Sequence, residues 1–317
     1  MDVGGIFSYL IFFLVIASIY GLLSLGLNIQ WGYTKLFNIG IAGFFAVGAY
    51  SSAILTTPAS PGHLGGFNLP FPVALVIAVL LSGLVAFVIG LPTLRLREDY
   101  LAIATIGIAE TIRLIFNNED WLANGVRGVS GIPRPFERYI SFNYNLFYLM
   151  LMVALVIGVY LALEIALKSP WGRVLKAIGE DEAVTQAMGK NVFRYKMESL
   201  VLGSMIMGMA GSLYAHFIQF ISPEVFVPMT GTFLVWVMLI AGGSGSNKGA
   251  LLGAVVIWGV WSLTGLISNV VPIEFAVKAG ALRVIVIAIF LEVILIVRPQ
   301  GILGEKRVLR SARQATE

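Results

Sequence analysis

The chain has 317 residues, of which 58% are hydrophobic and only 12% are charged, and its mean hydropathy is +0.90. Soluble domains carry about 25% charged residues, so this composition indicates an integral membrane protein rather than a soluble one. The net charge of +4 fits the basic loops of such a protein, so we expect no nucleic-acid partner.

Nine apolar stretches predict an all-α polytopic bundle, because runs near 20 residues have the length of membrane helices rather than of barrel strands. The first run lacks a basic region and a cleavage site before it, so we interpret it as a span and not as a signal peptide. A count of eight to ten helices also fits, because the seventh stretch is short and residues 28–38 could form a broken or re-entrant helix. The nine stretches are residues 6–27, 39–56, 69–91, 100–116, 146–167, 200–221, 229–242, 250–267 and 281–297.

The lysine and arginine residues divide unequally between the two sides that nine spans define. With the N-terminus outside, the inner segments carry fifteen of them and the outer segments carry four. Cytoplasmic loops are enriched in Lys and Arg, so we predict an external N-terminus and a cytoplasmic C-terminus. The inner segments are then residues 28–37, 92–99, 168–199, 243–249 and the chain from residue 298 onward.

The longest strongly charged segment, residues 168–199, contains a predicted short amphipathic helix over residues 180–188. Acidic residues at 180–182 suit a helix N-terminus, and Gly189 suits its end. The apolar stripe of this helix could pack on the protein's own core, on the lipid surface or on a soluble partner. The stripe consists of Ala183, Val184, Ala187 and Met188.

Glu110 and Arg113 lie three residues apart within the fourth apolar stretch and could pair on one helical face. A charge at mid-bilayer costs about 2.5–3.5 kcal/mol on insertion scales, so ionisable residues there are candidates for function. We expect Glu110 either to line a solute path or to form a structural ion pair with Arg113.

A second polar cluster surrounds the second apolar stretch. A broken helix could expose such groups to a polar solute near the membrane midplane. The alternative is an interfacial belt of polar and aromatic residues. The cluster consists of Asn28, Gln30, Tyr33, Asn38 and Tyr50.

The sequence offers nothing for catalysis or for nucleotide binding. There is no cysteine, and His63 and His216 are the only histidines, so we expect no disulfide, no metal site and no cofactor on this chain. The turn at residues 242–249 lacks the Gly-Lys-Ser/Thr end of a Walker A loop, since Lys248 is followed by Gly249. The chain should therefore not hydrolyse ATP by itself.

Several long segments carry a resemblance to a known family. They are LSLGLNIQWGYTKLFNIGIAGFFAVGAY (23–50), LPTLRLREDYLAIATIGIAETIRLIFNN (91–118), GVSGIP (128–133), WGRVLKAIGEDEAVTQAMGKNVFRYK (171–196) and VRPQGILG (297–304). In this order the sequence resembles the LivM-type permeases of branched-chain amino acid ABC importers.

The resemblance implies a heteromeric importer in the cytoplasmic (inner) membrane of a bacterium or archaeon. Its other parts would be a LivH-like second permease, two cytoplasmic ABC ATPase subunits and an extracytoplasmic solute-binding protein. The chain would be one transmembrane permease domain without enzymatic activity. Residues 6–167 would form its first helical half, 168–199 a cytoplasmic coupling loop, 200–297 the second half and 298–317 a basic tail.

The resemblance also assigns a role to the charged loop. In ABC importers a short cytoplasmic helix of the permease seats in a groove of the ATPase. Glu182 and Ala183 with Gly189 partly resemble the EAA signature of that helix, although Val184 replaces its second alanine, one extra residue precedes Gly189 and the downstream proline is missing. Arg194, together with Arg173 and Lys176, would meet acidic groups or lipid phosphates. The implied coupling residues are Glu182, Ala183, Val184, Ala187, Met188, Gly189 and Arg194.

We therefore expect the permease subunit of an importer for branched-chain or related amino acids. One alternative is a permease of the same family for urea, short amides or other amino acids. A second is an autonomous secondary transporter, for which Glu110 and Glu292 would have to supply the ion ligands. A purely structural membrane anchor would leave the intramembrane charges unexplained.

Overall fold

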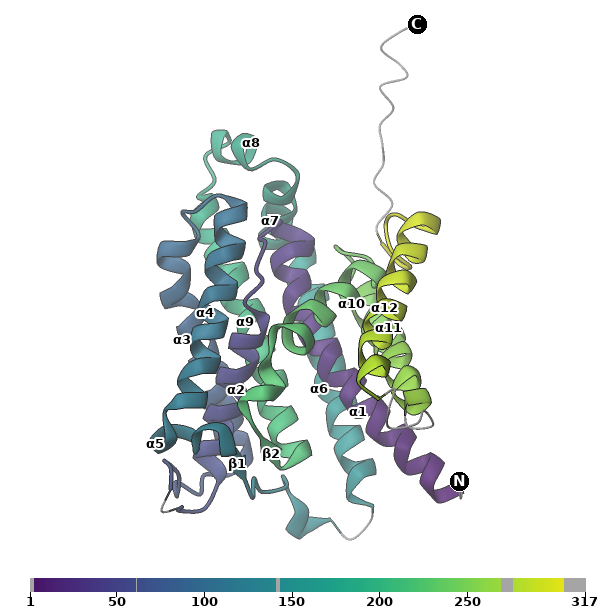
Figure 1. The fold of residues 1–317 in the computed structure, drawn as a ribbon. Coiled ribbons are helices and arrows are strands. Elements are labelled where there is room, and N and C mark those ends of the chain that lie inside the picture. The colour runs from purple at the N-terminus through teal and green to yellow at the C-terminus, as the bar shows by residue number, and fades with distance from the viewer. Residues whose placement is uncertain (1–2, 61, 141–142, 269–275, 305–317) are drawn as a thin grey trace, which may run out of the picture.

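The fold is taken from a computed structural model that describes residues 3–60, 62–140, 143–268 and 276–304 (Figure 1). Most of the described chain is helical, which confirms the all-α class predicted for a membrane protein. Five of the described helices are long and apolar enough to cross a membrane, and Ile41–Thr56 and Met229–Gly242 are shorter apolar helices. The basic tail predicted from residue 298 is described only as far as residue 304.

The helices and strands follow one another as a chain of long helices with short connecting elements. In order they are α1 (Val3–Leu27), the π-helix η1 (Asn28–Tyr33), α2 (Ile41–Thr56), α3 (Phe71–Thr93), α4 (Glu98–Asn118), α5 (Asp120–Ala123), η2 (Gly125–Arg127), β1 (Val129–Ser130), η3 (Glu137–Tyr139), α6 (Tyr144–Lys168), α7 (Pro170–Glu180), α8 (Glu182–Ala187), α9 (Val192–Ile218), β2 (Phe220–Ile221), η4 (Pro223–Phe226), the π-helix η5 (Met229–Phe233), α10 (Leu234–Gly242), α11 (Asn247–Ser268) and α12 (Ala276–Val297).

Helix α9 is the centre of the bundle, and small residues let its neighbours approach it closely. A Cβ atom built on Gly48 of α2 would overlap the carbonyl oxygen of Gly208, and one built on Gly211 would overlap the carbonyl oxygen of Phe45. Close backbone approach of this kind is how membrane helices associate without a hydrophobic driving force. The spaced residues Ser204, Gly208 and Ser212 are accordingly buried.

The loops gather at two ends of the bundle. At one end Lys176 lies 5.6 Å from the ring of Tyr33, and the guanidinium of Arg95 lies 6.0 Å from the ring of Phe193. Leu303 donates its backbone N–H to the carbonyl of Gly242 at this end too. We call it the α8 end, because α8 projects from it (Figure 1).

The opposite end carries the small antiparallel pair of β1 and β2, in which Val129 faces Ile221. Here the backbone N–H of Leu64 donates to the carbonyl of Trp121 at 2.7 Å. Figure 1 shows the start of α1 on the same side, away from α8. The predicted inner segments, as far as the structure describes them, therefore lie together at the α8 end, and the predicted outer loops 57–68 and 117–145 lie together at this β end. The outer loop after residue 267 lies largely outside the described residues.

The segment before α2 and the π-helix η5 before α10 are irregular, and the two irregular regions lie next to each other. The chain leaves the helical state after Thr34, runs without regular structure over residues 35–40 and resumes as α2 at Ile41. The backbone N–H of Ala42 then donates to Oγ1 of Thr232 in η5 at 3.1 Å, and Nε1 of Trp236 donates to the carbonyl of Asn38 at 3.1 Å. The start of α2 thus packs against the start of the short segment that leads into α10.

This arrangement corrects the expectation that residues 28–37 form an inner loop in water. Residues 28–33 remain helical as the π-helix η1, which extends the first apolar helix to Tyr33. Asn28 and Gln30 are fully buried. The structure therefore supports the broken-helix alternative for this segment.

Candidate functional site

The charged loop between α6 and α9 contains two helices rather than the single one expected over residues 180–188. Glu180 is the last residue of α7, and Asp181 is the N-cap of α8, where its Oδ1 accepts the backbone N–H of Val184 at 3.0 Å. Sequence reasoning missed α7. Its signals are a proline at the first helical position and apolar residues with helical spacing, namely Trp171, Val174, Leu175 and Ile178.

The two helices present opposite kinds of surface. Helix α7 buries Leu175 and Ile178. The apolar stripe of α8, in contrast, is exposed, with Val184 at 53% and Met188 at 63% of full exposure. Ala183 and Ala187 are also exposed, whereas Thr185 is the buried residue of this helix. The stripe therefore does not pack on the chain's own core, which removes one of its three possible partners.

Charged residues fix α8 relative to the start of α9. Glu182 forms an ion pair with Lys196, and Nε of Arg194 donates to Oε1 of Glu198 at 2.8 Å. Oε2 of Glu198 also accepts the indole N–H of Trp171 at 2.8 Å, so α7 and α9 are joined. Gly189 follows α8 with a φ of +78°, a conformation that glycine adopts without strain. Glu182 thus joins α8 to α9, and Arg194 orients the Glu198 carboxylate that joins α9 to α7.

Three buried side-chain amides hold the broken region in place. Nε2 of Gln30 donates to the carbonyl of Leu200 at 3.0 Å, and its Oε1 accepts Nδ2 of Asn38 at 2.8 Å. Oδ1 of Asn38 accepts the backbone N–H of Gly40 at 2.7 Å, directly before α2. Asn28, Gln30 and Asn38 are each 0% exposed, so an interfacial belt does not describe them.

The network continues through residues outside the predicted polar cluster. Nδ2 of Asn28 donates to Oδ1 of Asn247, and Nδ2 of Asn247 donates to Oε1 of Glu164 at 3.1 Å. The hydroxyl of Ser199 donates to the carbonyl of Ile29 at 3.0 Å. Buried polar groups require such partners, but the partners come from α6, α9 and α11, and nothing in their local sequence identifies them.

The two tyrosines of the predicted cluster occupy different surroundings. Tyr33 ends η1 at 6% exposure, near Lys176 of α7. Tyr50 is fully buried on α2, and its ring stacks on Phe116 of α4 with centroids 4.0 Å apart. The Tyr50 hydroxyl has no hydrogen-bond partner among the described residues. Tyr50 therefore joins α2 to α4, on the side of the bundle where Glu110 lies.

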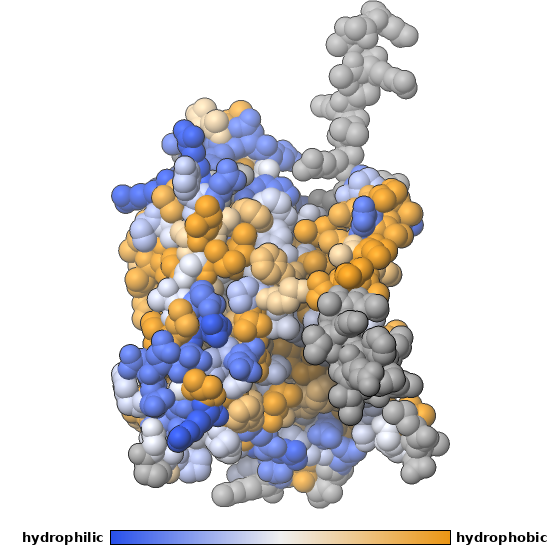
Figure 2. Space-filling model, viewed as in Figure 1, coloured by the Kyte–Doolittle hydropathy of each residue, from blue (hydrophilic) through white to orange (hydrophobic). Residues whose placement is uncertain are grey.

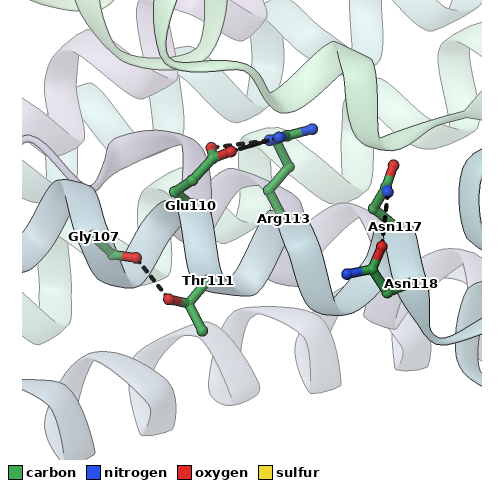
Figure 3. A network of polar contacts seen from close by, with 6 residues as sticks. All are labelled: Gly107, Glu110, Thr111, Arg113, Asn117 and Asn118. Carbon is green, nitrogen blue, oxygen red and sulfur yellow. Dashed lines mark hydrogen bonds and ion pairs between the residues drawn. The ribbon is translucent and has the colours of Figure 1, made fainter.

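Glu110 and Arg113 form the expected pair on α4 (Figure 3). Nε of Arg113 donates to both carboxylate oxygens of Glu110, at 3.0 and 2.9 Å. Their side chains point to one side of α4, while Thr111 points to the other and donates to the carbonyl of Gly107 at 2.8 Å. Asn117 follows one turn beyond Arg113. We call Glu110, Arg113 and Asn117 the α4 polar edge.

The α4 polar edge is accessible in the single chain. The side chain of Glu110 is 36% exposed and that of Arg113 is 19% exposed. Figure 2 shows hydrophilic residues at mid-height over α4, with hydrophobic residues around them. A charged pair in this position cannot face hydrocarbon without a large cost, so it requires water or a polar partner surface.

Comparison with known proteins places these features in a family. A family model described as "Branched-chain amino acid transport system / permease component" matches residues 9–295. The high-affinity branched-chain amino acid permease LivM of Salmonella typhimurium is 30% identical over 313 residues, covering 91% of this chain and 68% of the relative. A probable LivM permease of Methanocaldococcus jannaschii is 27% identical over 322 residues, covering 92% of each chain.

More distant similarity extends to the permease named as LivH. The probable LivH permease of Methanocaldococcus jannaschii is 25% identical over 311 residues, covering 89% of this chain and 88% of the relative. No solved structure shows a significant match to this chain.

Proposed function

Because the chain belongs to the permease family of branched-chain amino acid transport systems, we propose that it carries branched-chain amino acids into the cell as one membrane subunit of an ATP-driven importer. The family is one of transport components and not of enzymes. The observation that carries the proposal is α8, whose apolar stripe faces away from the chain at the end where the basic segments meet. ATP hydrolysis then belongs to partner subunits.

The chain is a multi-pass all-α membrane protein. We infer that it crosses the cytoplasmic (inner) membrane of a bacterium or archaeon nine times as a single transmembrane domain. The α8 end lies in the cytoplasm and the start of α1 lies outside. The excess of lysine and arginine in the segments that meet at the α8 end supports this orientation.

Helix α8 seats in a groove of a cytoplasmic ATPase subunit. Its four apolar residues are exposed, and it is too short to be stable without support, so the N-cap Asp181 and the Glu182–Lys196 pair keep it helical for docking. Val184 and Met188 enter the groove, and Arg194 contacts acidic groups or lipid phosphates beside it. Nucleotide-driven closure of two ATPase subunits is transmitted through this contact.

The second half of the translocation path comes from a LivH-like permease. The similarity of this chain to a LivH permease along nearly its whole length supports a pair of related subunits. Their α4 faces lie towards each other, because the exposed pair of Glu110 and Arg113 requires polar surroundings. An extracytoplasmic solute-binding protein delivers the amino acid to the β end. Glu110 lines the path. The broken helix beside the path is held in position by Asn28, Gln30, Tyr33, Asn38 and Tyr50.

Two alternatives make different demands on the protein. A permease for urea or short amides would keep the whole assembly and change only the solute. An autonomous secondary transporter would require coupling-ion ligands in the membrane, and it would have no use for an exposed apolar stripe on α8. The exposure of Val184 and Met188 favours a partner-driven importer over the second alternative.

Co-purification tests the coupling role. We expect an ATPase subunit to purify with the wild type in mild detergent and to be lost from Ala183→Arg/Met188→Asp, because both changes place charge in the stripe. Val126→Asp is the matched control, since Val126 is 64% exposed, close to the 63% of Met188, but lies at the β end. Retention of the ATPase by the double variant contradicts coupling through α8.

Uptake by the assembled importer in proteoliposomes tests the substrate. We expect uptake of radiolabelled leucine, isoleucine and valine that requires ATP and the solute-binding protein and persists when ion gradients are collapsed. Uptake of urea or short amides in place of these amino acids would assign the first alternative. Uptake driven by an ion gradient without ATP would assign the second.

A further inference from the structure

The α4 polar edge combines features that a purely structural ion pair does not need. Glu110 and Arg113 pair through two carboxylate oxygens, yet they lie about 18 and 22 Å along α4 from its start at ~1.5 Å per residue, within a helix that the proposed function places in the membrane. Their side chains remain 36% and 19% exposed. The edge therefore requires surroundings that solvate charge, and on the proposed function these are the path between two permease subunits.

The surroundings allow the pair to separate without leaving an isolated charge. Glu224 of η4 lies close enough to Arg113 for an electrostatic interaction, so Arg113 has a second carboxylate nearby. Asn117, one turn away, adds an amide that both donates and accepts hydrogen bonds. Gly107 precedes Glu110 by one turn, and nothing lies within 4 Å of where its Cβ would be. A side chain introduced at position 107 therefore meets open space.

We propose that the α4 polar edge binds the two charged groups of a zwitterionic α-amino acid during translocation. Arg113 receives the carboxylate of the amino acid with its planar fork of N–H donors, and Glu110 accepts hydrogen bonds from the ammonium group. In the empty path the two side chains satisfy each other, and a zwitterion replaces each with an equivalent partner. This inference rests on the proposed function, and it adds the part of the amino acid that the permease itself recognises.

The chemistry favours a zwitterion over other solutes of the alternatives. A guanidinium and a carboxylate form charge-assisted hydrogen bonds with opposite ends of one small molecule, and arginine matches a carboxylate in a bidentate manner. Urea and short amides carry no charge to replace the pair. The leucine side chain itself forms no hydrogen bonds with the α4 polar edge and would lie against the apolar residues of the path.

Single and double neutral variants separate this role from a structural one. If Glu110 and Arg113 only stabilise each other, Glu110→Gln and Arg113→Gln each leave an unpaired charge, and the double variant recovers because no charge is left unpaired. If they bind the zwitterion, the double variant transports no better than either single variant. We expect leucine uptake by all three to fall roughly tenfold or more, the size of effect that a lost charge-assisted hydrogen bond produces.

The measurement is uptake and ATP hydrolysis by the purified importer in proteoliposomes, at saturating leucine-loaded binding protein. ATP hydrolysis should remain within about twofold of the wild type, because the α8 contact is untouched. The control pair is Arg134→Gln/Glu137→Gln, which removes an i, i+3 ion pair outside the predicted membrane spans and should leave uptake unchanged. Recovery of uptake in the Glu110→Gln/Arg113→Gln variant overturns the proposal.

A labelling experiment keeps the proposal testable if those variants assemble poorly. The chain has no cysteine, so a single introduced one can be followed specifically. Gly107→Cys should react with a membrane-impermeant thiol reagent and be protected by leucine delivered by its binding protein, whereas Ile165→Cys, at a residue 72% exposed on the apolar α6, should not react. Lack of reaction at position 107, or reaction that leucine does not slow, overturns the inference.

The outcomes also distinguish this inference from the proposed function. If the wild-type importer does not transport leucine, the proposed function fails. If it transports leucine and the Glu110 and Arg113 variants transport it equally well, only the zwitterion site fails.

Discussion

Asn28 and Asn247 are 219 positions apart in the sequence, and the amide Nδ2 of Asn28 donates to Oδ1 of Asn247 at 2.9 Å. Oδ1 of Asn28 also accepts the backbone N–H of Gly245 at 2.8 Å. One buried side chain therefore joins the π-helical end of the first crossing to the turn that begins α11. These bonds connect α1 to α11 at the α8 end of the bundle, next to the broken region.

Asn28→Ala should destabilise the protein because it leaves the amide of Asn247 and the N–H of Gly245 without their partner. Each buried group left unsatisfied costs about 1–3 kcal/mol in soluble proteins, and membrane proteins tend toward the lower part of that range. We expect a lower unfolding temperature in detergent. Asn118→Ala, which breaks the exposed amide–amide bond to Asn117, should change it little. Equal effects of the two variants would contradict the role assigned to Asn28.

Gly48→Ala should disrupt the contact between α2 and α9. The added methyl group would overlap the carbonyl oxygen of Gly208, which is backbone and cannot rotate away, and overpacking of this kind costs about 1–3 kcal/mol or more. Gly158→Ala is the matched control, because nothing lies within 4 Å of a Cβ at that position of α6. We expect loss of monodisperse protein on size-exclusion chromatography for Gly48→Ala and none for Gly158→Ala. Normal behaviour of both would show that the two helices can move apart.

Asp181→Ala should weaken binding of the ATPase without touching the apolar stripe of α8. The Asp181 side chain caps this six-residue helix, and loss of an N-cap costs about 1 kcal/mol. We expect an increase of about fivefold in the dissociation constant of the ATPase subunit, measured by titration in nanodiscs. Asn191→Ala removes the same kind of cap from the 27-residue α9 and should have a smaller effect. A larger increase in the dissociation constant for Asn191→Ala would mean that the orientation of α9, and not the N-cap of α8, determines the affinity for the ATPase.

His216→Leu should loosen the loop at the β end. Nδ1 of His216 lies 2.8 Å from the carbonyl of Pro133, which can only accept, so Nδ1 carries the proton and Nε2 accepts from Ser52 at 2.9 Å. We expect faster hydrogen exchange at Ile132 in the variant. His63→Leu is the control, since Nδ1 of His63 bonds to the carbonyl of its own neighbour Leu64 and so holds no distant segment in place. Unchanged exchange at Ile132 would show that the pairing of β1 with β2 fixes the loop unaided.

Much of the fold could be predicted from sequence because hydrophobic length and the placement of lysine and arginine are local signals. They located the long apolar helices and grouped the segments that meet at each end. The i, i+3 spacing predicted the Glu110–Arg113 pair for the same reason. The stripe of α8 was also visible, although its helix begins at Glu182, because Asp181 acts as the cap and Glu180 belongs to α7.

The rest depended on tertiary contacts that no local pattern encodes. Asn247 and Glu164 have no sequence signal that connects them to Asn28, since their side chains meet only when α1, α6 and α11 are assembled. Residues 35–40 are similar, because their sequence indicates a polar connection, and only the structure shows that Leu36, Asn38 and Gly40 are buried. The break is stable because the surrounding helices supply the hydrogen bonds that a regular helix would make internally.

The short crossing that ends in α10 has a consequence for how the protein is made. Residues 229–242 are 14 in number, which at ~1.5 Å per residue gives about 21 Å, well short of the ~30 Å hydrocarbon core. This segment cannot partition into lipid by itself as an independent helix. Its N-terminal end is completed by the hydrogen bond from Ala42 to Thr232, so α2 must already be in place when it enters the membrane. The short segment 229–242 therefore relies on α2 for its place in the bundle, and deletion of α2 should leave residues 229–242 outside the membrane while α11, which is long and apolar enough to cross unaided, still inserts.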